Sequence, residues 1–520
     1  MSGLSAPADL AAARPAQAQA PAPIWLSRSF ALPVIVALFA VRLVLCAAAG
    51  LGDDEAYYWT WSRVMEWSYF EHPGMVAWPI HLFTSILGNH EIAVRLPTLL
   101  WSAATMVVVF KLVRRLFPED EPLAWGTILV LNVVPLMSIG AVFVAPDAPF
   151  AFFWVLSLYF ARKAVGGREA PAQPVYWYAT GLAAGLGLVS KYNMVLLPPT
   201  LVLYLLASGT LVRELKKKEP YLALSLMLLF FAPVVIWNAE HHWASFLFHL
   251  HDRHSGKMHP FTHAGQFVAT QFGLVSPVLL PVMIAGLRWA WKTKDDRWIF
   301  VVCASSFIVV FFGVLSPVGD FKPHWPAVGY VTGVIAAVGW LRGFASARLR
   351  GWAVGIATGL TLTAYSIAFV PVGAWAEELA DRVHPEWTPA IVKADLTNDL
   401  YGWNVAADAA RHLQTGLNRP FFFGHMYQNA SEFAFAAPEL EVTRLGTRHD
   451  EFEIRRDDEA LRGRDGVFFA RSNFFQDPEG KYPFAGGCTR AEDAPFSRGG
   501  RVVRTFSFWI CRDYQPTREP

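Results

Sequence analysis

Three consecutive acidic residues, Asp53, Asp54 and Glu55, precede the aromatic run Tyr-Tyr-Trp at 57–59. A carboxylate here could act as a general base, or bind a cation that serves a phosphate substrate. One or two of the acids could instead cap the helix that we expect over 56–67. Three acids beside a bilayer are costly, and capping explains two at most. We therefore predict that Asp54 and Glu55 are catalytic and that Asp53 caps the helix.

Asp147 and Lys191 each stand at the border of an apolar segment. Asp147 is the centre of Ala-Pro-Asp-Ala-Pro, where it could be a second catalytic acid or the N-cap of a helix. Lys191 lies in Ser-Lys-Tyr-Asn between two short apolar segments, where it could bind a phosphate or extend its ammonium group to water at the interface. We predict a catalytic role for Asp147 and substrate binding for Lys191, and both alternatives stay open.

The segment Gly-Asp-Phe-Lys-Pro-His-Trp-Pro at 319–326 also combines ionisable and aromatic residues. Lys322 and His324 could hold or protonate a departing phosphate, and Trp325 could stack on a sugar or an isoprenoid. The alternative is a turn in the aromatic belt of the membrane. Arg95 could reach a lipid phosphate, or it could pair with a buried group, as we expect of Arg42.

Several common catalytic motifs do not occur in the sequence: a P-loop, a GxGxxG after a strand, paired CxxC and a GxSxG nucleophile. An energy-rich substrate would then arrive from the membrane rather than as a nucleotide. The net charge of +2 does not indicate a nucleic-acid partner. The histidine-rich segment 241–259 lacks regular metal spacing, so a solvated loop is favoured over a metal site. We predict no metal ligands, although a divalent cation stays open as a cofactor.

Long apolar segments must position these residues. The 520-residue chain is 54% hydrophobic and only 17% charged, and it contains 21 Trp, a residue that gathers at membrane interfaces. This composition predicts an α-helical polytopic membrane protein with about eleven transmembrane helices, of which the fourth to sixth are short. The expected spans are 30–50, 93–111, 123–143, 148–162, 176–190, 193–208, 220–237, 265–287, 298–315, 325–341 and 352–372.

Basic residues are concentrated in alternate loops, which orients the spans. The clusters fall at 111–115, 162–168, 213–218, 288–294 and 342–350. By the positive-inside rule these loops are cytoplasmic. All the acidic, lysine and histidine motifs described above then lie on the opposite, periplasmic face.

The composition changes at both ends of the apolar region. Residues 1–28 are rich in Ala and Pro and predict a disordered cytoplasmic tail, and 29–373 form the transmembrane domain. Residues 374–520 are polar, with strand-like runs at 420–423 and 466–469 and a helix-like stretch at 405–413, which predicts a periplasmic α/β domain. Cys488 and Cys511 could form a disulfide there. The motif at 427–435 reads as the start of a helix, and ordinary packing is its favoured role.

These motifs together resemble the GT-C glycosyltransferases. The similarity is greatest to the bacterial branch related to protein O-mannosyltransferases, the ArnT aminoarabinose transferases and the Rgt-type galacturonosyltransferases. It covers residues 30–330 well and is looser over the C-terminal region. The matching residues are Asp54-Glu55-Ala-Tyr57-Tyr58-Trp, Tyr69-Phe-Glu-His72-Pro, Pro146-Asp147-Ala-Pro, Ser190-Lys191-Tyr192, Trp237-Asn238 with Ser245-Phe246, and Lys322-Pro-His324-Trp325-Pro.

The resemblance implies an inverting transfer of a sugar from a polyprenyl-phosphate donor on the periplasmic face, with Asp54 as the catalytic carboxylate. It also implies that the remaining motif residues bind substrate. We extend that expectation to Arg95. The substrate-binding set is then Tyr57, Tyr58, His72, Arg95, Lys191, Tyr192, Lys322, His324 and Trp325.

We expect the acceptor to be a glycolipid, such as lipid A or the lipopolysaccharide core, in the bacterial inner membrane. Protein hydroxyl groups are the alternative acceptor. A transporter or flippase of lipid-linked sugars is the alternative from another class. Transporters usually place ionisable residues at the midplane between repeated halves, and neither feature is evident in this sequence.

Overall fold

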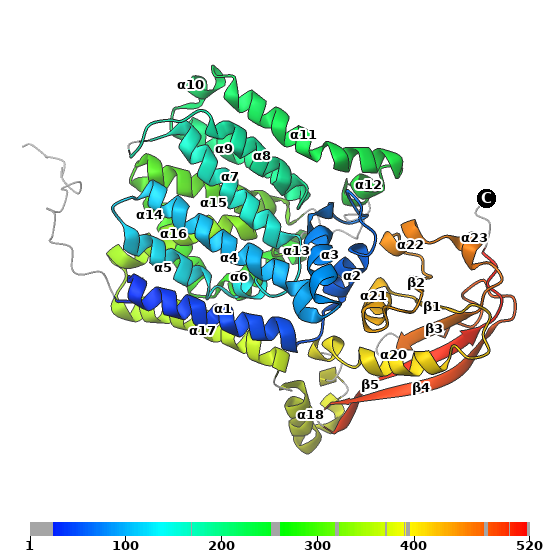
Figure 1. Ribbon diagram of the computed structural model, residues 1–520. Helices are drawn as coiled ribbons and strands as arrows, with labels where there is room; N and C mark the ends of the chain where they lie inside the picture. The colour runs from blue at the N-terminus through cyan, green and yellow to red at the C-terminus, as the bar shows by residue number, and fades with distance from the viewer. Residues whose placement is uncertain are drawn as a thin grey trace, which may run out of the picture.

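The computed structural model describes residues 24–167, 169–250, 260–317, 322–369, 372–388, 390–391, 396–472, 477–498 and 500–516. A bundle of apolar helices forms one part, and a smaller part containing a sheet lies against one end of the bundle (Figure 1). The bundle helices are α1 (Arg28–Ala48), α4 (Glu91–Leu116), α5 (Glu121–Leu131), α7 (Asp147–Val165), α8 (Tyr176–Leu188), α9 (Leu197–Ala207), α11 (Glu219–Glu240), α13 (Pro260–Val275), α14 (Leu279–Lys292), α15 (Asp296–Leu315), α16 (Ala327–Phe344) and α17 (Ala347–Phe369).

Every predicted span contains at least one of these helices. In the described residues, five of them are long and apolar enough to cross a membrane by themselves, namely α1, α4, α11, α15 and α16. The others are shorter, more polar or broken, so the total of about eleven spans stays a prediction. The chain is nevertheless a multi-span membrane protein, as its composition predicted.

Two predicted spans are not continuous helices. The span expected at 265–287 consists of α13 and α14, which meet at an angle of 96°. Pro277, between them, has no N–H to donate, and the Ser276 hydroxyl accepts from the backbone N–H of Leu279 at 3.3 Å, so one helix ends and another begins. The span expected at 123–143 divides into α5 and the short α6 (Pro135–Ile139), again at a proline.

The basic loops meet at the end of the bundle away from the sheet (Figure 1). Ion pairs connect them there: Arg342 with Asp120 at 2.6 Å, and Arg162 with Asp296 at 2.5 Å. The alternation of loops is therefore a property of the fold as well as of the sequence. Arg42 is buried inside the bundle and donates to Tyr365 and Asn132, which confirms the expected pairing of this residue.

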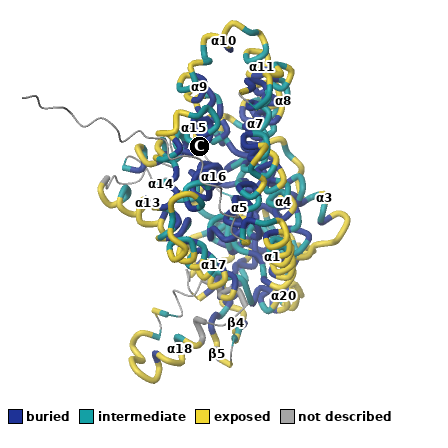
Figure 2. The backbone as a smooth tube through the Cα atoms, turned by 90° about the vertical axis from the view of Figure 1, so that its left-hand side faces the viewer, coloured by how far each residue is buried: buried dark blue, intermediate teal, exposed yellow. Residues whose placement is uncertain are grey.

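The loop between α1 and α4 crosses the other end of the bundle. It contains α2 (Asp53–Trp61), the single turn η2 (Gly74–Val76) and α3 (Ala77–Leu87). Figure 2 views the bundle end-on, from the end that carries the basic loops. In this view α3 extends sideways beyond the neighbouring helices. On the same side as this loop lie the turn η3 (Tyr192–Leu196), the short helix α12 (Ala244–Leu250) and the N-terminal ends of α7 and α16.

The C-terminal part is an α/β domain with a five-stranded sheet in the order β2-β1-β3-β5-β4. Strands β1, β2 and β3 are parallel, and β5 and β4 continue the sheet in antiparallel fashion. Its elements are η6 (Leu396–Leu400), α20 (Trp403–His412), β1 (Phe421–Gly424), α21 (Tyr427–Ala436), β2 (Val442–Arg444), α22 (Glu451–Arg455), α23 (Asp458–Leu461), β3 (Gly466–Arg471), β4 (Cys488–Arg498) and β5 (Arg501–Cys511).

Alternating side chains of the short strands supply both faces of the sheet. Phe422 and Phe469 pack with α20 and α21 on one face, and Phe421 and Phe468 pack on the other. The strands expected at 420–423 and 466–469 and the helix at 405–413 are confirmed. Cys488 and Cys511, paired across β4 and β5, form a disulfide.

Candidate active site

The acidic loop begins the helix α2. Gly52 is its N-cap, and the backbone N–H of Gly52 donates to Glu55 Oε2 at 2.8 Å. All three acids therefore lie in the first turn, where the partial positive charge of the helix stabilises them. The capping side chain is that of Glu55, so the expectation that Asp53 caps this helix is wrong. Asp53 instead lies 3.6 Å from Arg471 of β3, and burial raises its pKa to about 6.

Glu55 and Arg95 form a buried ion pair. Arg95 Nε donates to Glu55 Oε1 at 2.9 Å, and the remaining guanidinium nitrogens donate to the carbonyl groups of Ala49 and Gly50. Glu55 Oε1 also accepts from the backbone N–H of Val144 at 2.9 Å. The carboxylate thus joins two of the loops at the end of the bundle opposite the basic loops. We call these the outer loops and number them along the chain: 51–92, 143–147, 190–192, 238–264 and 316–324. This geometry favours a structural role for Glu55 and Arg95 over the catalytic and substrate-binding roles predicted for them.

Asp54 is the exposed acid of the three. Its carboxylate borders a cleft between the bundle and the C-terminal domain and accepts from the Tyr427 hydroxyl at 2.9 Å. The other residues along this cleft are Gly52, Asp53, Glu55, Phe143, Val144, Ala145, Asp399, Leu400 and Gln428. Asp54 is therefore the acid of this turn that is open to a substrate.

Asp147, Lys191 and His324 come together from three outer loops. Lys191 Nζ donates to both carboxylate oxygens of Asp147 at 2.8 Å, and His324 Nε2 lies 3.8 Å from Asp147 Oδ2. The ring centroid of Trp325 is 6.0 Å from Lys191 Nζ. We call Asp147, Lys191 and His324 the ion cluster. The structure thus brings together the second, third and fifth outer loops.

The alternatives for Asp147 and Lys191 do not fit this geometry. Asp147 is the first residue of α7, and the N-cap is Pro146. Lys191 is 4% exposed and paired, so its ammonium group does not extend to water at the interface. Lys322 is exposed near the cluster, at the start of the turn that leads to α16.

Tyr58 connects the ion cluster with the acidic turn. Its ring is buried, and burial, with the nearby carboxylates of Asp54 and Asp147, raises the pKa of its hydroxyl well above the usual value. Within the described part of the chain, this hydroxyl has no hydrogen-bond partner. The role of Tyr58 in substrate binding stays a prediction.

The other predicted aromatic residues and His72 have mixed surroundings. Tyr57 is buried against Tyr427 and accepts from the backbone N–H of Glu451, which favours packing over substrate binding. The Tyr192 hydroxyl shares a hydrogen bond with Ser245 at 2.8 Å. The ring of His72 lies 6.4 Å from that of Tyr58. These contacts thus lie between residues of the outer loops and not with the acids of the first turn of α2.

The described residues contain no group of three or more His, Cys, Asp or Glu side chains arranged to hold a metal ion. The histidine-rich segment is covered only up to Leu250, and residues 251–259 lie outside the described residues. The prediction that no metal ligands can be assigned therefore stays a prediction.

The sequence did not predict the contribution of the C-terminal domain to this region. Tyr427 contacts Asp54, Arg448 pairs with Glu71, and Phe70 N–H donates to Glu451 Oε2 at 2.8 Å. The motif that begins at Tyr427 was visible in the sequence, but ordinary packing was its favoured role. Nothing in the spacing of the chain connects Tyr427 with the acidic turn.

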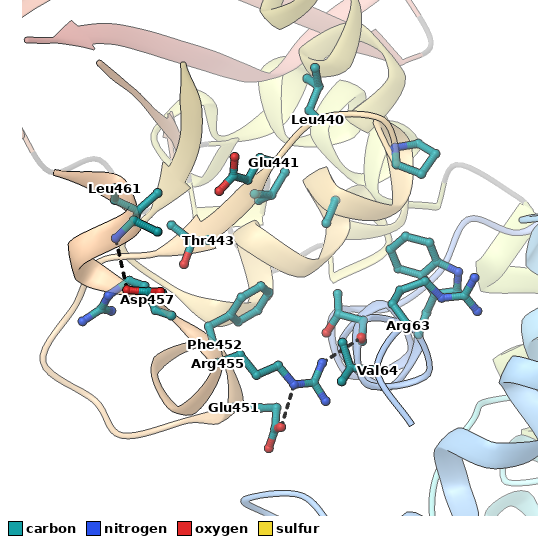
Figure 3. A pocket seen from close by; sticks show the side chains of 17 residues that line it. Arg63, Val64, Leu440, Glu441, Thr443, Glu451, Phe452, Arg455, Asp457 and Leu461 are labelled. Carbon is teal, nitrogen blue, oxygen red and sulfur yellow. Dashed lines mark hydrogen bonds and ion pairs between the residues drawn. The ribbon is translucent and has the colours of Figure 1, made fainter. Parts of the chain in front are cut away.

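A second cleft opens on the far side of α2, toward its C-terminal end (Figure 3). Two of its ionic groups form a pair: Arg455 Nε donates to Glu451 at 2.8 Å, and Arg455 Nη1 donates to the carbonyl oxygen of Thr60. None of the predicted catalytic or substrate-binding residues lines it. The cleft at Asp54 is therefore the better candidate for the site.

The helical bundle, with its composite outer loops, defines the GT-C architecture. Residues 71–237 match the family model described as dolichyl-phosphate-mannose-protein mannosyltransferase. The fold is similar to that of ArnT from Cupriavidus metallidurans bound to undecaprenyl phosphate, with a TM-score of 0.63 and 18% identity over 93% of this chain and 98% of that one. The apo state of the same protein gives a TM-score of 0.60 over 92% of this chain and 97% of that one.

Two curated relatives extend the comparison. The chain is 27% identical to the lipid A galacturonosyltransferase RgtD of Rhizobium johnstonii, over 61% of this chain and 65% of the relative. It is 26% identical to the undecaprenyl phosphate-alpha-4-amino-4-deoxy-L-arabinose arabinosyl transferase 1 of Pseudomonas fluorescens, over 52% of this chain and 53% of the relative. The chain thus spans less than two thirds of either relative. The resemblance to GT-C glycosyltransferases and the predicted fold class are confirmed.

Proposed function

We propose that the chain is an inverting glycosyltransferase. It transfers a sugar from a polyprenyl-phosphate donor to lipid A or the lipopolysaccharide core at the periplasmic face of the bacterial inner membrane. The observation that carries the proposal is that Asp54, an open carboxylate, and the ion cluster lie at the same end of an apolar bundle, with Tyr58 within electrostatic reach of both Asp54 and Asp147. The family model and the names of the two relatives support the same class of reaction.

The donor side of the reaction needs positive charge, because a phosphate departs as the new bond forms. Lys191 supplies positive charge, His324 adds to it when it is protonated, and Lys322 is exposed two residues before His324. Asp147 holds Lys191 in place through both carboxylate oxygens, which supports a positioning role for this acid. Trp325, packed between Lys191 and Phe312, offers an aromatic surface close to the lipid.

The acceptor side needs a carboxylate near the attacking oxygen. Asp54 takes the proton when the acceptor is a hydroxyl group, while that oxygen attacks the anomeric carbon from the side opposite the phosphate. When the acceptor is already an anionic phosphate, no strong base is needed, and Asp54 then orients the acceptor. The Tyr58 hydroxyl, between the two groups of charges, donates to the sugar or to the phosphate.

The decisive experiment replaces Asp54 by Asn in the full-length protein and measures sugar transfer in membranes. The membranes contain undecaprenyl-phosphate sugars, with galacturonic acid and aminoarabinose tested in turn, and lipid A. We expect a loss of at least about 100-fold, the usual contribution of a positioned acid or base. Glu66→Gln, in the same outer loop, is the matched control and retains activity.

Full activity of a correctly inserted Asp54→Asn protein would contradict the proposal. Transfer to protein hydroxyl groups instead of lipid A would keep the reaction class and change the acceptor. Movement of the intact lipid-linked sugar across the bilayer, without a new glycosidic product, would support a transporter instead.

A further inference from the structure

The three parallel strands of the C-terminal sheet end at the first outer loop of the bundle. The residue that ends a strand, or one that follows it within a few positions, contacts an acid of that loop in each case. The pairs are Tyr427 with Asp54 after β1, Arg448 with Glu71 after β2, and Arg471 with Asp53 at the end of β3. The carboxyl ends of parallel strands are a common place for functional residues in α/β domains. Here that edge faces the candidate active site.

Tyr427 is held firmly in this edge. It begins α21, the helix that packs on α2, and its ring centroid lies 4.6 Å from that of Tyr57. The guanidinium carbon of Arg448 lies 4.6 Å from the centroid of the Tyr427 ring, and Arg448 is itself paired with Glu71. The hydroxyl of Tyr427 therefore has a defined position relative to the acidic turn.

In the hydrogen bond between Tyr427 and Asp54, the tyrosine hydroxyl is the donor and the carboxylate is the acceptor. Burial and the Asp54 carboxylate raise the pKa of the Tyr427 hydroxyl above its usual value, so it stays protonated and donates to Asp54 Oδ1. In the described residues, this is the one side-chain hydrogen bond of Asp54. The bond restrains the orientation of the carboxylate at the border of the cleft.

We propose that Tyr427 is a positioning residue of the active site, and that the C-terminal domain completes this site by holding the Asp54 carboxylate in one orientation. The inference rests on the proposed function, because it requires Asp54 to take part in the transfer. It assigns to the C-terminal domain a part in the reaction itself. The domain is then needed for activity in addition to any role in holding the acceptor.

The test uses Tyr427→Phe in the full-length protein, in proteoliposomes with an undecaprenyl-phosphate sugar donor and lipid A. The ring and its packing on Tyr57 and Arg448 remain, so only the hydroxyl group is lost. We expect kcat to fall about tenfold while the KM for the donor is unchanged, because the carboxylate loses the one hydrogen bond that fixes its orientation.

Tyr514→Phe is the matched control. The Tyr514 hydroxyl also donates to a carboxylate, Asp458 Oδ1 at 2.7 Å, in the same domain but outside the cleft at Asp54. Its kcat and its KM for the donor should coincide with those of the unmodified protein.

An unchanged kcat in Tyr427→Phe would overturn the inference. A higher KM for the donor with an unchanged kcat would overturn it too, because the hydroxyl group would then act in binding rather than in orienting Asp54. The proposed function fails separately, when the unmodified protein transfers no sugar or when Asp54→Asn is fully active.

Discussion

The two charged groups of the candidate site are built in different ways. The ion cluster consists of residues from the outer ends of the bundle, and its Asp147–Lys191 pair spans 44 positions of the chain. Asp54 has its hydrogen-bond partner in the C-terminal domain, 373 positions away. The bundle alone thus sets the cationic side of the site, whereas docking of a second domain sets the acidic side. Variants in the two groups should therefore fail in different ways.

The largest effect that separates the two groups is expected for Lys191→Met. It removes the buried ammonium group that we propose to lie beside the donor phosphate, and it leaves the apolar stem in place. Loss of one preorganised charge that stabilises a departing anion costs roughly 10²- to 10³-fold in kcat. The measurement is single-turnover transfer with saturating donor, which follows the chemical step.

Lys163→Met is the control for this variant. Lys163 lies over the ring of Tyr176 at the other end of the bundle, so its loss should leave transfer unchanged. Equal losses in the two lysine variants would mean that general damage to the bundle, rather than the ion cluster, causes the effect.

A structural effect of comparable size is expected for Arg95→Met. This change leaves the Glu55 carboxylate buried with two backbone donors and no cation. Removing one partner of a buried pair costs about 3–5 kcal/mol of stability. The expected result is a lower thermal unfolding midpoint in detergent, with little folded protein left to assay.

The double variant Arg95→Met with Glu55→Met sharpens this assignment. It removes both charges, so we expect it to recover part of the lost stability. Should Glu55→Gln instead fold normally and abolish transfer, the structural role assigned to Glu55 would be wrong and the catalytic one restored.

The sequence predicted the fold class well because membrane helices have strong local signals. Apolar length indicated every helix-bearing segment, and charge bias indicated which loops share a face. The break between α13 and α14 was missed, because a single Pro277 inside an apolar run does not distinguish a kink from a break. The ion cluster could be anticipated because all its members stand at the outer ends of spans.

The partners of the acidic turn could not be predicted in this way. Glu55 and Asp54 are neighbours in the sequence, yet one faces Arg95 inside the loop and the other faces the cleft. Helix geometry separates the directions of adjacent side chains, but it does not say which direction is buried. The contact of Tyr427 with Asp54 depends on how two domains dock, and a single sequence carries no local signal for that.

The smallest of these effects is a pH dependence of stability. It tests only the contact between the C-terminal domain and the first outer loop. Burial raises the pKa of Glu451 from its ordinary 4.5 to about 7. The folded protein therefore binds a proton that the unfolded chain releases between about pH 4.5 and 7. The free energy of unfolding is highest below this window. It falls as the pH rises through the window, by at most about 3 kcal/mol for this carboxyl group, and is constant above it.

Glu451→Gln should remove that decline, because the amide still accepts from Phe70 N–H but does not titrate. The measurement is the difference in thermal unfolding midpoint between variant and unmodified protein from pH 4 to pH 8. Glu459→Gln, an exposed acid paired with Arg462, is the control and should leave the pH dependence as it is. A difference in midpoint that stays constant from pH 4 to pH 8 would show that Glu451 is ionised in the folded protein. The C-terminal domain would then contribute to the acidic side of the site only by its position.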